Sequence, residues 1–188
     1  MNTLKTEKRS LDVKAKQIRK QGFVTGNIFG KEIEGSIPIQ MSQKEAEHFF
    51  KENPIGSKVI LEVEGKPITV LVKDIMIDSV RHQLMEVDCQ ALVKGEKVHS
   101  IAEIILLNQE KVTMGIVEQQ LFEINYSAYP EDIVSKVEID IEHMKIGDTI
   151  RVSDLEIAKN ENIEITSELD AAVVTVIPTH TVEEVDAE

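Results

Sequence analysis

Short runs of Val, Ile and Leu, interrupted by Gly, Pro and Asp, recur along the whole chain and constrain its fold more than any other feature. Such runs, rich in β-branched residues and bounded by turn residues, are typical of β-strands. None approaches the ~18 consecutive apolar residues that a membrane helix needs. A chain of 188 residues is long enough for two small domains. We therefore expect a mainly β protein with two domains and no membrane span.

The first half of the chain combines strands with a helix. Residues 42–45 (Ser-Gln-Lys-Glu) have the form of a capping box and predict a helix that runs to about residue 52. On this helix, Phe49 and Phe50 are expected to anchor the core rather than to stack on bases. Gly-Lys-Pro at 65–67 predicts the turn of a hairpin. The expected strands are 25–29, 36–41, 59–64, 68–73 and 84–93.

After the polar stretch 94–97, the chain shows signals for strands only, at the spacing of ~8–12 residues that is typical of an all-β module. We expect a first domain at 1–93, an acidic all-β domain at 94–181 and a frayed acidic tail at 182–188. The strands expected in the second domain are 98–107, 112–117, 121–126, 137–141, 150–152, 163–165 and 173–177.

Charge is divided unevenly between the two halves. The net charge of the chain is −13, but residues 1–95 hold 15 Lys and Arg against 13 Asp and Glu, whereas residues 96–188 hold 6 against 21. Residues 1–31 alone carry eight basic and two acidic side chains. This basic segment is either a solvated surface or an electrostatic footprint for RNA or DNA, because phosphate binding draws its affinity from Lys and Arg.

The residue pattern offers little support for catalysis, cofactors or metals. Cys89 is the only cysteine, and the five histidines are scattered without the spacing of metal ligands. No nucleotide-binding loop or nucleophile elbow is present. An acid cluster contains Asp74, Asp78, Glu86 and Asp88, but solvated surface acids are the commoner reading of such a group. Because the N-terminus has no apolar signal segment, we expect a cytoplasmic protein. Because the motifs above are missing, we expect a protein that is not an enzyme and uses no metal or cofactor.

Several motifs resemble one known family. They are residues 18–24 (Ile-Arg-Lys-Gln-Gly-Phe-Val) with 28–30 (Ile-Phe-Gly), 71–75 (Leu-Val-Lys-Asp-Ile) with 87–88, 129–133 (Tyr-Pro-Glu-Asp-Ile), 137–141 and 146–155. Together they resemble the general-stress-protein Ctc family of bacterial large-subunit ribosomal proteins that bind 5S rRNA, in its two-domain form. The motifs span almost the whole chain.

This resemblance implies a six-stranded β-barrel with short helices, followed by a second all-β domain. It implies that the barrel binds the loop E region of 5S rRNA within the large ribosomal subunit, with neighbouring ribosomal proteins as further partners. Cationic side chains would neutralise phosphates, and Asp88 could accept hydrogen bonds from base amino groups or 2′-hydroxyls. The expected RNA-binding residues are Arg9, Lys14, Lys16, Arg19, Lys20, Phe29, Lys73, Glu86 and Asp88.

The chain departs from the family at some of these places. The loop after the first strand is two residues shorter, and Lys16-Gln17 replaces a pair of arginines. Glu86 places a carboxylate where the family has histidine, next but one to Asp88 and therefore on the same strand face. Thr25, Phe29, Met76 and Cys89 also replace the residues usual in the family, which are Pro, Tyr, Gln and Phe. The alternative is therefore a diverged, stress-related paralogue that acts as a protein-interaction module with weak or no rRNA binding.

Overall fold

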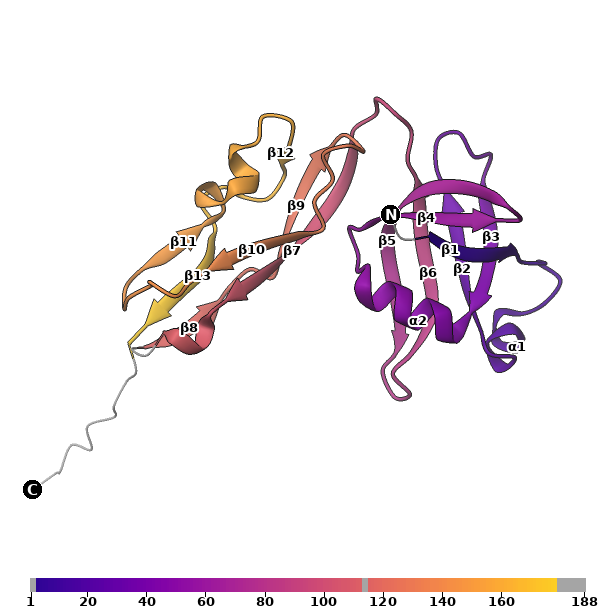
Figure 1. Cartoon of the computed structure of the whole chain (residues 1–188), viewed down its shortest axis with the longest axis horizontal. Coiled ribbons are helices and arrows are strands. Elements are labelled where there is room, and N and C mark those ends of the chain that lie inside the picture. The colour runs from indigo at the N-terminus through magenta and orange to yellow at the C-terminus, as the bar shows by residue number, and fades with distance from the viewer. Residues whose placement is uncertain (1–2, 113–114, 179–188) are drawn as a thin grey trace, which may run out of the picture.

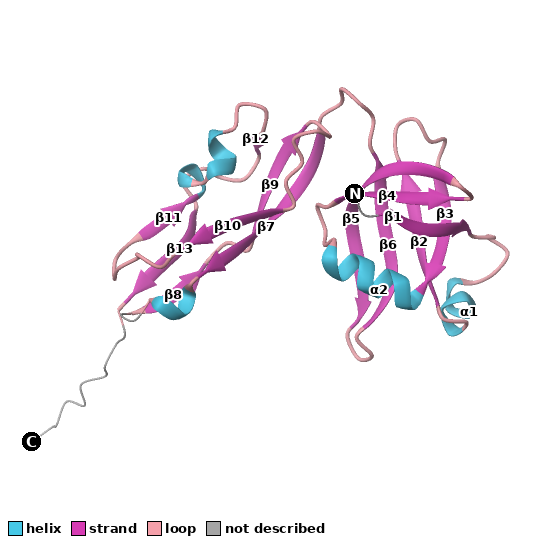
Figure 2. Ribbon diagram, in the orientation of Figure 1, coloured by secondary structure: helices cyan, strands magenta, loops and turns pink. Residues whose placement is uncertain are grey.

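The computed structural model describes residues 3–112 and 115–178, and these residues form two β-rich bodies joined by a short connection (Figure 1). The mainly β class is confirmed, and helices are short and few (Figure 2). No helix in the described ranges is long and apolar enough to cross a membrane. The predicted tail at 182–188 lies outside the described residues.

The N-terminal body is a closed barrel of six strands, as expected, in the order β1-β3-β2-β6-β5-β4. β1 pairs with β4 in parallel and β2 pairs with β6 in parallel, while all the other neighbours are antiparallel. The strands are β1 (Thr3–Lys8), β2 (Phe23–Phe29), β3 (Ser36–Ser42), β4 (Lys58–Val63), β5 (Lys66–Asp78) and β6 (Gln83–Ala91).

Alternation along each strand fills the barrel with apolar side chains. Val24 and Ile28 of β2 point inward and are fully buried, as are Val87 and Cys89 of β6. This is the arrangement that a period of two residues predicts for a sheet with one face on a core. The barrel therefore directs the intervening residues of β2 and β6 outward.

Two helices accompany the barrel. Helix α2 (Gln43–Glu52) packs Ala46 and Phe50 into the core, and Phe49 is half-buried against Phe50 with ring centroids 5.2 Å apart. The expectation that both phenylalanines are core anchors is confirmed. The six-residue helix α1 (Ala15–Lys20) lies outside the barrel against β2 and buries only Ile18. Its remaining side chains are free to face solvent or a ligand.

Three local predictions for this barrel were wrong or incomplete. Ser42 makes no side-chain capping bond, because it is still extended and paired in β3, and the amide of Gln43 donates instead to the Gly22 carbonyl. The hairpin turn lies one residue earlier than predicted, at Glu64-Gly65, where both residues have positive φ. β1 was not predicted from its own residue pattern, since only Leu4 and Thr6 in it are buried.

The second body consists of two small sheets around one core, with the strand orders β10-β7-β9-β12 and β11-β13-β8. Tyr126 is fully buried, and its hydroxyl donates to the Val134 carbonyl and accepts from the Val134 amide. The strands are β7 (Val98–Leu107), β8 (Ile116–Gln119), β9 (Glu123–Ala128), β10 (Lys136–Asp140), β11 (Thr149–Arg151), β12 (Glu164–Ile165) and β13 (Ala172–Ile177). Single 3₁₀ turns are η1 (Gln109–Lys111), η2 (Val152–Asp154) and η3 (Glu156–Lys159).

Two strands of the second body begin two or more residues later than predicted. The predicted strand 112–117 begins only at Ile116, because η1 ends at Lys111 and Gly115 has a φ of 92° that breaks an extended run. Residues 113 and 114 of that prediction lie outside the described part. The predicted strand 121–126 is likewise displaced by two residues, to β9.

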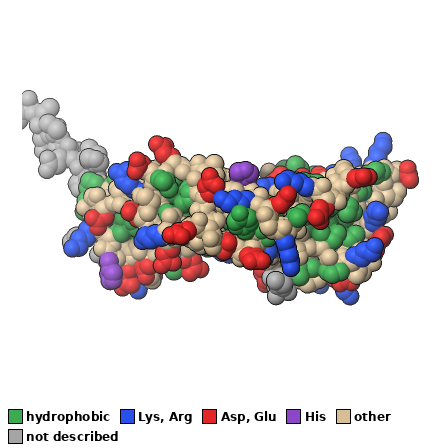
Figure 3. Space-filling model, turned by 90° about the horizontal axis from the view of Figure 1, so that it is seen from above, with side chains coloured by type: hydrophobic (Ala, Val, Ile, Leu, Met, Phe, Trp, Pro, Cys, Tyr) green, Lys and Arg blue, Asp and Glu red, His purple; other side chains and the backbone are tan. Residues whose placement is uncertain are grey.

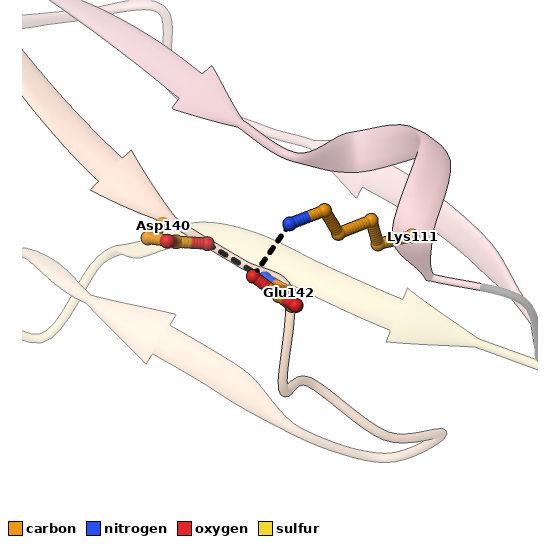
Figure 4. Close-up of polar contacts among 3 residues, drawn as sticks. All are labelled: Lys111, Asp140 and Glu142. Atoms are coloured by element: carbon orange, nitrogen blue, oxygen red, sulfur yellow. Dashed lines mark hydrogen bonds and ion pairs between the residues drawn. The ribbon is translucent and has the colours of Figure 1, made fainter.

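A polar cluster links η1, the turn after β7, to the end of β10 (Figure 4). Asp140 accepts a hydrogen bond from the Glu142 amide at 2.9 Å, and the Glu142 carboxylate forms a 2.8 Å ion pair with Lys111. The Asn108 side chain and the Glu142 amide both hydrogen-bond the charged Asp140 carboxylate and lower its pKa. The folded structure thus favours the ionised form of Asp140.

The connection between the two bodies is held by contacts to main-chain carbonyls. Lys73 Nζ donates to the His99 carbonyl at 3.0 Å, and Lys58 Nζ donates to the Pro130 carbonyl at 2.5 Å. Gly56 lies directly under β7, because a Cβ atom at this position would overlap the Ile101 carbonyl oxygen. The barrel and the second body therefore meet closely at this junction.

The close approach of β2 to β6 requires glycine at position 26. A Cβ atom on Gly26 would lie 2.6 Å from the Val87 carbonyl oxygen, so Gly26→Ala must push these two strands apart. We expect a loss of about 2 kcal/mol in the free energy of unfolding, within the usual cost of overpacking. Hydrogen exchange of the β2 and β6 amides should accelerate.

Gly65→Ala provides the control for this substitution, because an added Cβ at Gly65 meets open space and affects only a turn with positive φ. It should leave the exchange of the β2 and β6 amides unchanged. Unaltered protection of these amides in Gly26→Ala would contradict the close-packing account.

A second prediction concerns Asp140. Because the folded state lowers its pKa, the ionised carboxylate stabilises the fold above the ordinary value of 3.8, and this contribution is lost as the pH falls through the lower folded value. Asp140→Asn should therefore be less stable than the parent at pH 7, and the difference should shrink below about pH 4. Urea unfolding at a series of pH values measures this, with the exposed Asp170→Asn as the control. A difference that stays constant down to pH 2 would exclude the charge-based explanation.

Candidate nucleic-acid interface

The outer face of the barrel over β2 and β6 carries a row of polar side chains. The parallel register places Thr25 beside Glu86 and Asn27 beside Asp88. Glu86 and Asp88 therefore share one face, as their spacing predicts. On the next strand, Asp74 is opposite Asp88.

Asn27 connects the two carboxylates of β6. Its amide nitrogen donates to Glu86 Oε1 at 3.4 Å and to Asp88 Oδ1 at 3.1 Å. A side-chain amide has two N–H donors, and both are used here, so its carbonyl oxygen and the other carboxylate oxygens remain as acceptors. We call Asn27, Asp74, Glu86 and Asp88 the acceptor face. Such a face is suited to groups that donate hydrogen bonds.

Helix α1 brings basic side chains to the border of the acceptor face. Arg19 Nη1 lies 3.5 Å from Thr25 Oγ1, and the Thr25 hydroxyl in turn donates to the Met85 carbonyl. Arg19 and Lys20 occupy the last turn of the helix, where cations are favoured by the helix dipole. Lys14 and Lys16, at the start of the helix, are exposed.

Arg9 reaches the same region from the end of β1. Its amide donates to the carbonyl of Pro38, which pairs with Asn27 across β2 and β3. The guanidinium donates from Nη2 to the Val13 carbonyl at 3.1 Å, and its buried Nε has no hydrogen-bond partner among the described residues. We call these five cations the basic rim: Arg9, Lys14, Lys16, Arg19 and Lys20.

The structure groups most of the predicted RNA-binding residues but separates one of them. Lys73 lies at an irregularity in the pairing of β5 with β6, between Val72 and Asp74, and donates to the His99 carbonyl at the junction between the two bodies. Partial burial there lowers the pKa of the Lys73 ammonium. Phe29 is half-buried at the end of β2, beside Gln90 of β6.

Three residues at this surface were not predicted as binding residues: Asn27, Thr25 and Asp74, the last of which was noted only as part of the acid cluster. Asn27 stands between Thr25 and Phe29 at a period of two, and this alternation is the signal that could have identified it. Thr25 was noted only as a departure from the family, although it is fully buried beneath Arg19. Another departure, Cys89, points into the core, where burial and then the Asp88 charge raise the pKa of its thiol to about 12.

The acid cluster is not arranged as a pair of catalytic carboxylates. Asp78 lies at the end of the β5–β6 hairpin, where the amides of Val80 and Arg81 bond its carboxylate and lower its pKa. It caps a turn, whereas Glu86 and Asp88 orient Asn27. Among the described residues, no group of His, Cys, Asp and Glu has the arrangement of a metal site.

The distribution of charge over the surface matches the division seen in the sequence. Figure 3 shows acidic side chains gathered on the second body, while lysine and arginine side chains stand out around the outer end of the barrel. The cations of the first 31 residues belong to the barrel, and Arg19 among them lies at the border of the acceptor face.

Comparison with known proteins assigns both halves of the chain. Residues 4–89 match the sequence model of the Ribosomal L25p family, and residues 97–180 match that of the C-terminal domain of ribosomal protein TL5. The chain is a two-part ribosomal protein of this class.

Relatives that align with most of the chain identify its family more narrowly than the two half-chain matches do. The large ribosomal subunit protein bL25 of Alteromonas mediterranea is 30% identical over 186 residues, covering 92% of this chain and 86% of the relative. That of Thermodesulfovibrio yellowstonii is 29% identical, covering 98% and 86%. That of Geobacillus thermodenitrificans is 27% identical, covering 90% and 80%. The chain therefore belongs to the bL25 family of large ribosomal subunit proteins, which are structural components rather than enzymes. This confirms the family resemblance.

Proposed function

We propose that the protein is a structural component of the large ribosomal subunit that binds 5S rRNA through the acceptor face and the basic rim of its barrel. As a ribosomal component it acts in the cytoplasm. The predicted division of the chain gives the binding role to residues 1–93, while the acidic domain at 94–181 faces other neighbours. The loop E region is the part of 5S rRNA that the family resemblance predicts as the target.

The observation that carries this proposal is the adjacency of the acceptor face to the basic rim. The minor groove of an RNA helix is wide and shallow, and it displays 2′-hydroxyls and base amino groups between two lines of phosphates. Carboxylate and amide oxygens at the centre can accept from hydroxyl and amino donors. Cations at the border can neutralise phosphates and set the orientation of the protein. The barrel carries both kinds of group in this arrangement, with the acceptors at the centre and the cations at the border.

A salt titration tests the contribution of the basic rim. If about four of its five cations neutralise phosphates, log K for 5S rRNA should fall with log salt with a slope of roughly −3 to −4. Arg19→Ala should weaken binding about tenfold and reduce the slope by about one, because one phosphate contact is removed. Filter binding of the full chain measures both quantities.

Lys136→Ala is the matched control, because Lys136 is exposed on β10 of the acidic body. It should change neither affinity nor slope. An unrelated RNA hairpin provides the specificity control. Binding to 5S rRNA that is no tighter than binding to this hairpin would reject the proposal and favour the alternative, a protein-interaction module that has lost rRNA binding.

Glu86 gives a second test, because its carboxylate can accept hydrogen bonds from RNA but also repels the phosphates that border the minor groove. We expect the repulsion to outweigh the hydrogen bond. At ~6 Å a carboxylate and a phosphate repel by about 0.7 kcal/mol in water and by about 3 kcal/mol at an effective dielectric of 20. Glu86→Gln keeps the shape and one acceptor, so we expect 5S rRNA affinity to rise between threefold and a hundredfold, and Glu86→His to act in the same direction. Glu138→Gln on exposed β10 removes the same charge at a distance and should be almost neutral.

The opposite result for Glu86→Gln is equally informative. Weaker binding would mean that the charged carboxylate accepts a hydrogen bond from an RNA amino group or 2′-hydroxyl. The hydrogen bond to Glu86 would then outweigh the phosphate repulsion, and the expected gain in affinity would be wrong.

A further inference from the structure

An apolar groove of about 680 Å³ lies where the barrel meets the second body. One wall is formed by side chains of α2, the segment after it, β5 and β6, and the other by β7 and the start of β9. Its apolar lining includes Phe50, Ile55, Ile77, Leu84, Ile101 and Phe122. None of these residues belongs to the acceptor face or the basic rim.

Two large apolar side chains in this groove are exposed. Ile77 on the barrel is 56% exposed, and Phe122 on the second body is 66% exposed. A single exposed apolar side chain is ordinary, but a lined concave patch with such residues on both walls is typical of an interaction site. The groove thus has the surface of a binding site for apolar side chains.

The rim of the groove carries an unfavourable pair of charges. Glu103 of β7 is directly opposite Glu123 of β9 in the antiparallel register, and both line the groove. Both are exposed, and neither forms a salt bridge or side-chain hydrogen bond within the described ranges. Like charges directly opposite each other destabilise a sheet, and Lys136, which pairs with Glu103 from β10, forms no ion pair with either carboxylate in the described ranges. A cation placed between them would relieve this repulsion.

The chemistry of the groove distinguishes between two kinds of ligand, RNA and a segment of protein. The lining holds three carboxylates, of Glu47, Glu103 and Glu123, against one lysine, Lys51, so phosphates would meet net repulsion and RNA does not fit. A protein segment with apolar side chains on either side of a lysine or arginine fits both the walls and the rim. Proteins that bind RNA are rich in such cations. A basic segment of another RNA-binding protein would have this character.

We propose that this groove binds an extended segment of another protein, with apolar side chains seated against Ile77 and Phe122 and a basic side chain between Glu103 and Glu123. The site is separate from the proposed rRNA surface. β5 connects the two, because Ile77 lines the groove while Met76, its neighbour, pairs with Glu86 beside the acceptor face.

A peptide of alternating leucine and lysine serves as the probe, and a peptide of alternating leucine and glutamate is its charge-reversed counterpart. Titration of the full chain, followed by amide NMR shifts, should show the basic peptide shifting residues of the groove. The acidic peptide should bind at least tenfold more weakly. Phe122→Ser, and separately the double variant Glu103→Gln with Glu123→Gln, should each weaken the basic peptide at least fivefold.

Matched controls separate this site from general attraction to an acidic surface. Ile116→Ser removes a similarly exposed apolar side chain from β8, and Glu118→Gln with Glu138→Gln removes two charges from the same body. These variants should change peptide affinity less than twofold. Equal weakening by the controls, shifts spread over the whole acidic body, or no binding would overturn the proposal.

Stability and rRNA binding provide two further readouts. Glu103→Gln should raise the urea midpoint of the free protein, since it relieves the repulsion, while weakening the peptide; an unchanged or lower midpoint would contradict the charge-pair argument. Phe122→Ser should leave 5S rRNA affinity unchanged, and a loss there would place the groove in the rRNA surface instead. Direct NMR contacts between Ile77 and Phe122 in the free protein would show that the groove is closed by the chain itself.

Discussion

The parallel pairing of β2 with β6 is the constraint on which the rest of the barrel depends. It brings together two strands that are separated by more than fifty residues of chain and, with the β1–β4 pairing, closes the sheet. Gly26 permits the close approach, and the same register places Asn27 between Glu86 and Asp88. Closure of the barrel and assembly of the acceptor face are therefore consequences of one alignment. A shift of one residue would turn the polar row inward and the core outward.

Much of this organisation could be predicted from the sequence. The features that could not be predicted share one physical cause. The strands with buried alternate residues, such as β7, are predicted with their bounds because their pattern reflects a core on one face. β1 was missed because most of its side chains face solvent. The capping box at Ser42 failed because a strand partner, distant in sequence, already held that residue extended. Local pattern cannot reveal which distant strand supplies a partner.

The same limit explains the outcome at the candidate site. Charge density identified the basic rim, since cations close in sequence remain close on α1 and in the loop before it. The spacing of Glu86 and Asp88 correctly placed them on one face. Asn27 was not singled out, because its role depends on pairing with β6, and Lys73 lies at the junction because of an irregularity in β5. Residue types indicated the kind of surface, and the strand register decided its members.

At the junction of the two bodies, the barrel contributes the lysine side chains of the hydrogen bonds. The second body contributes only main-chain acceptors, the carbonyls of His99 and Pro130. Every residue has a main-chain carbonyl, so these acceptors survive almost any substitution on that side. The second body is consequently free to diverge in sequence, or to be exchanged for that of a relative, without losing its attachment. Substitution of Lys58 or Lys73 would remove these contacts, whereas substitution of His99 or Pro130 would leave their carbonyls in place. The ion pair of Lys31 with Glu96, by contrast, depends on a side chain from each part.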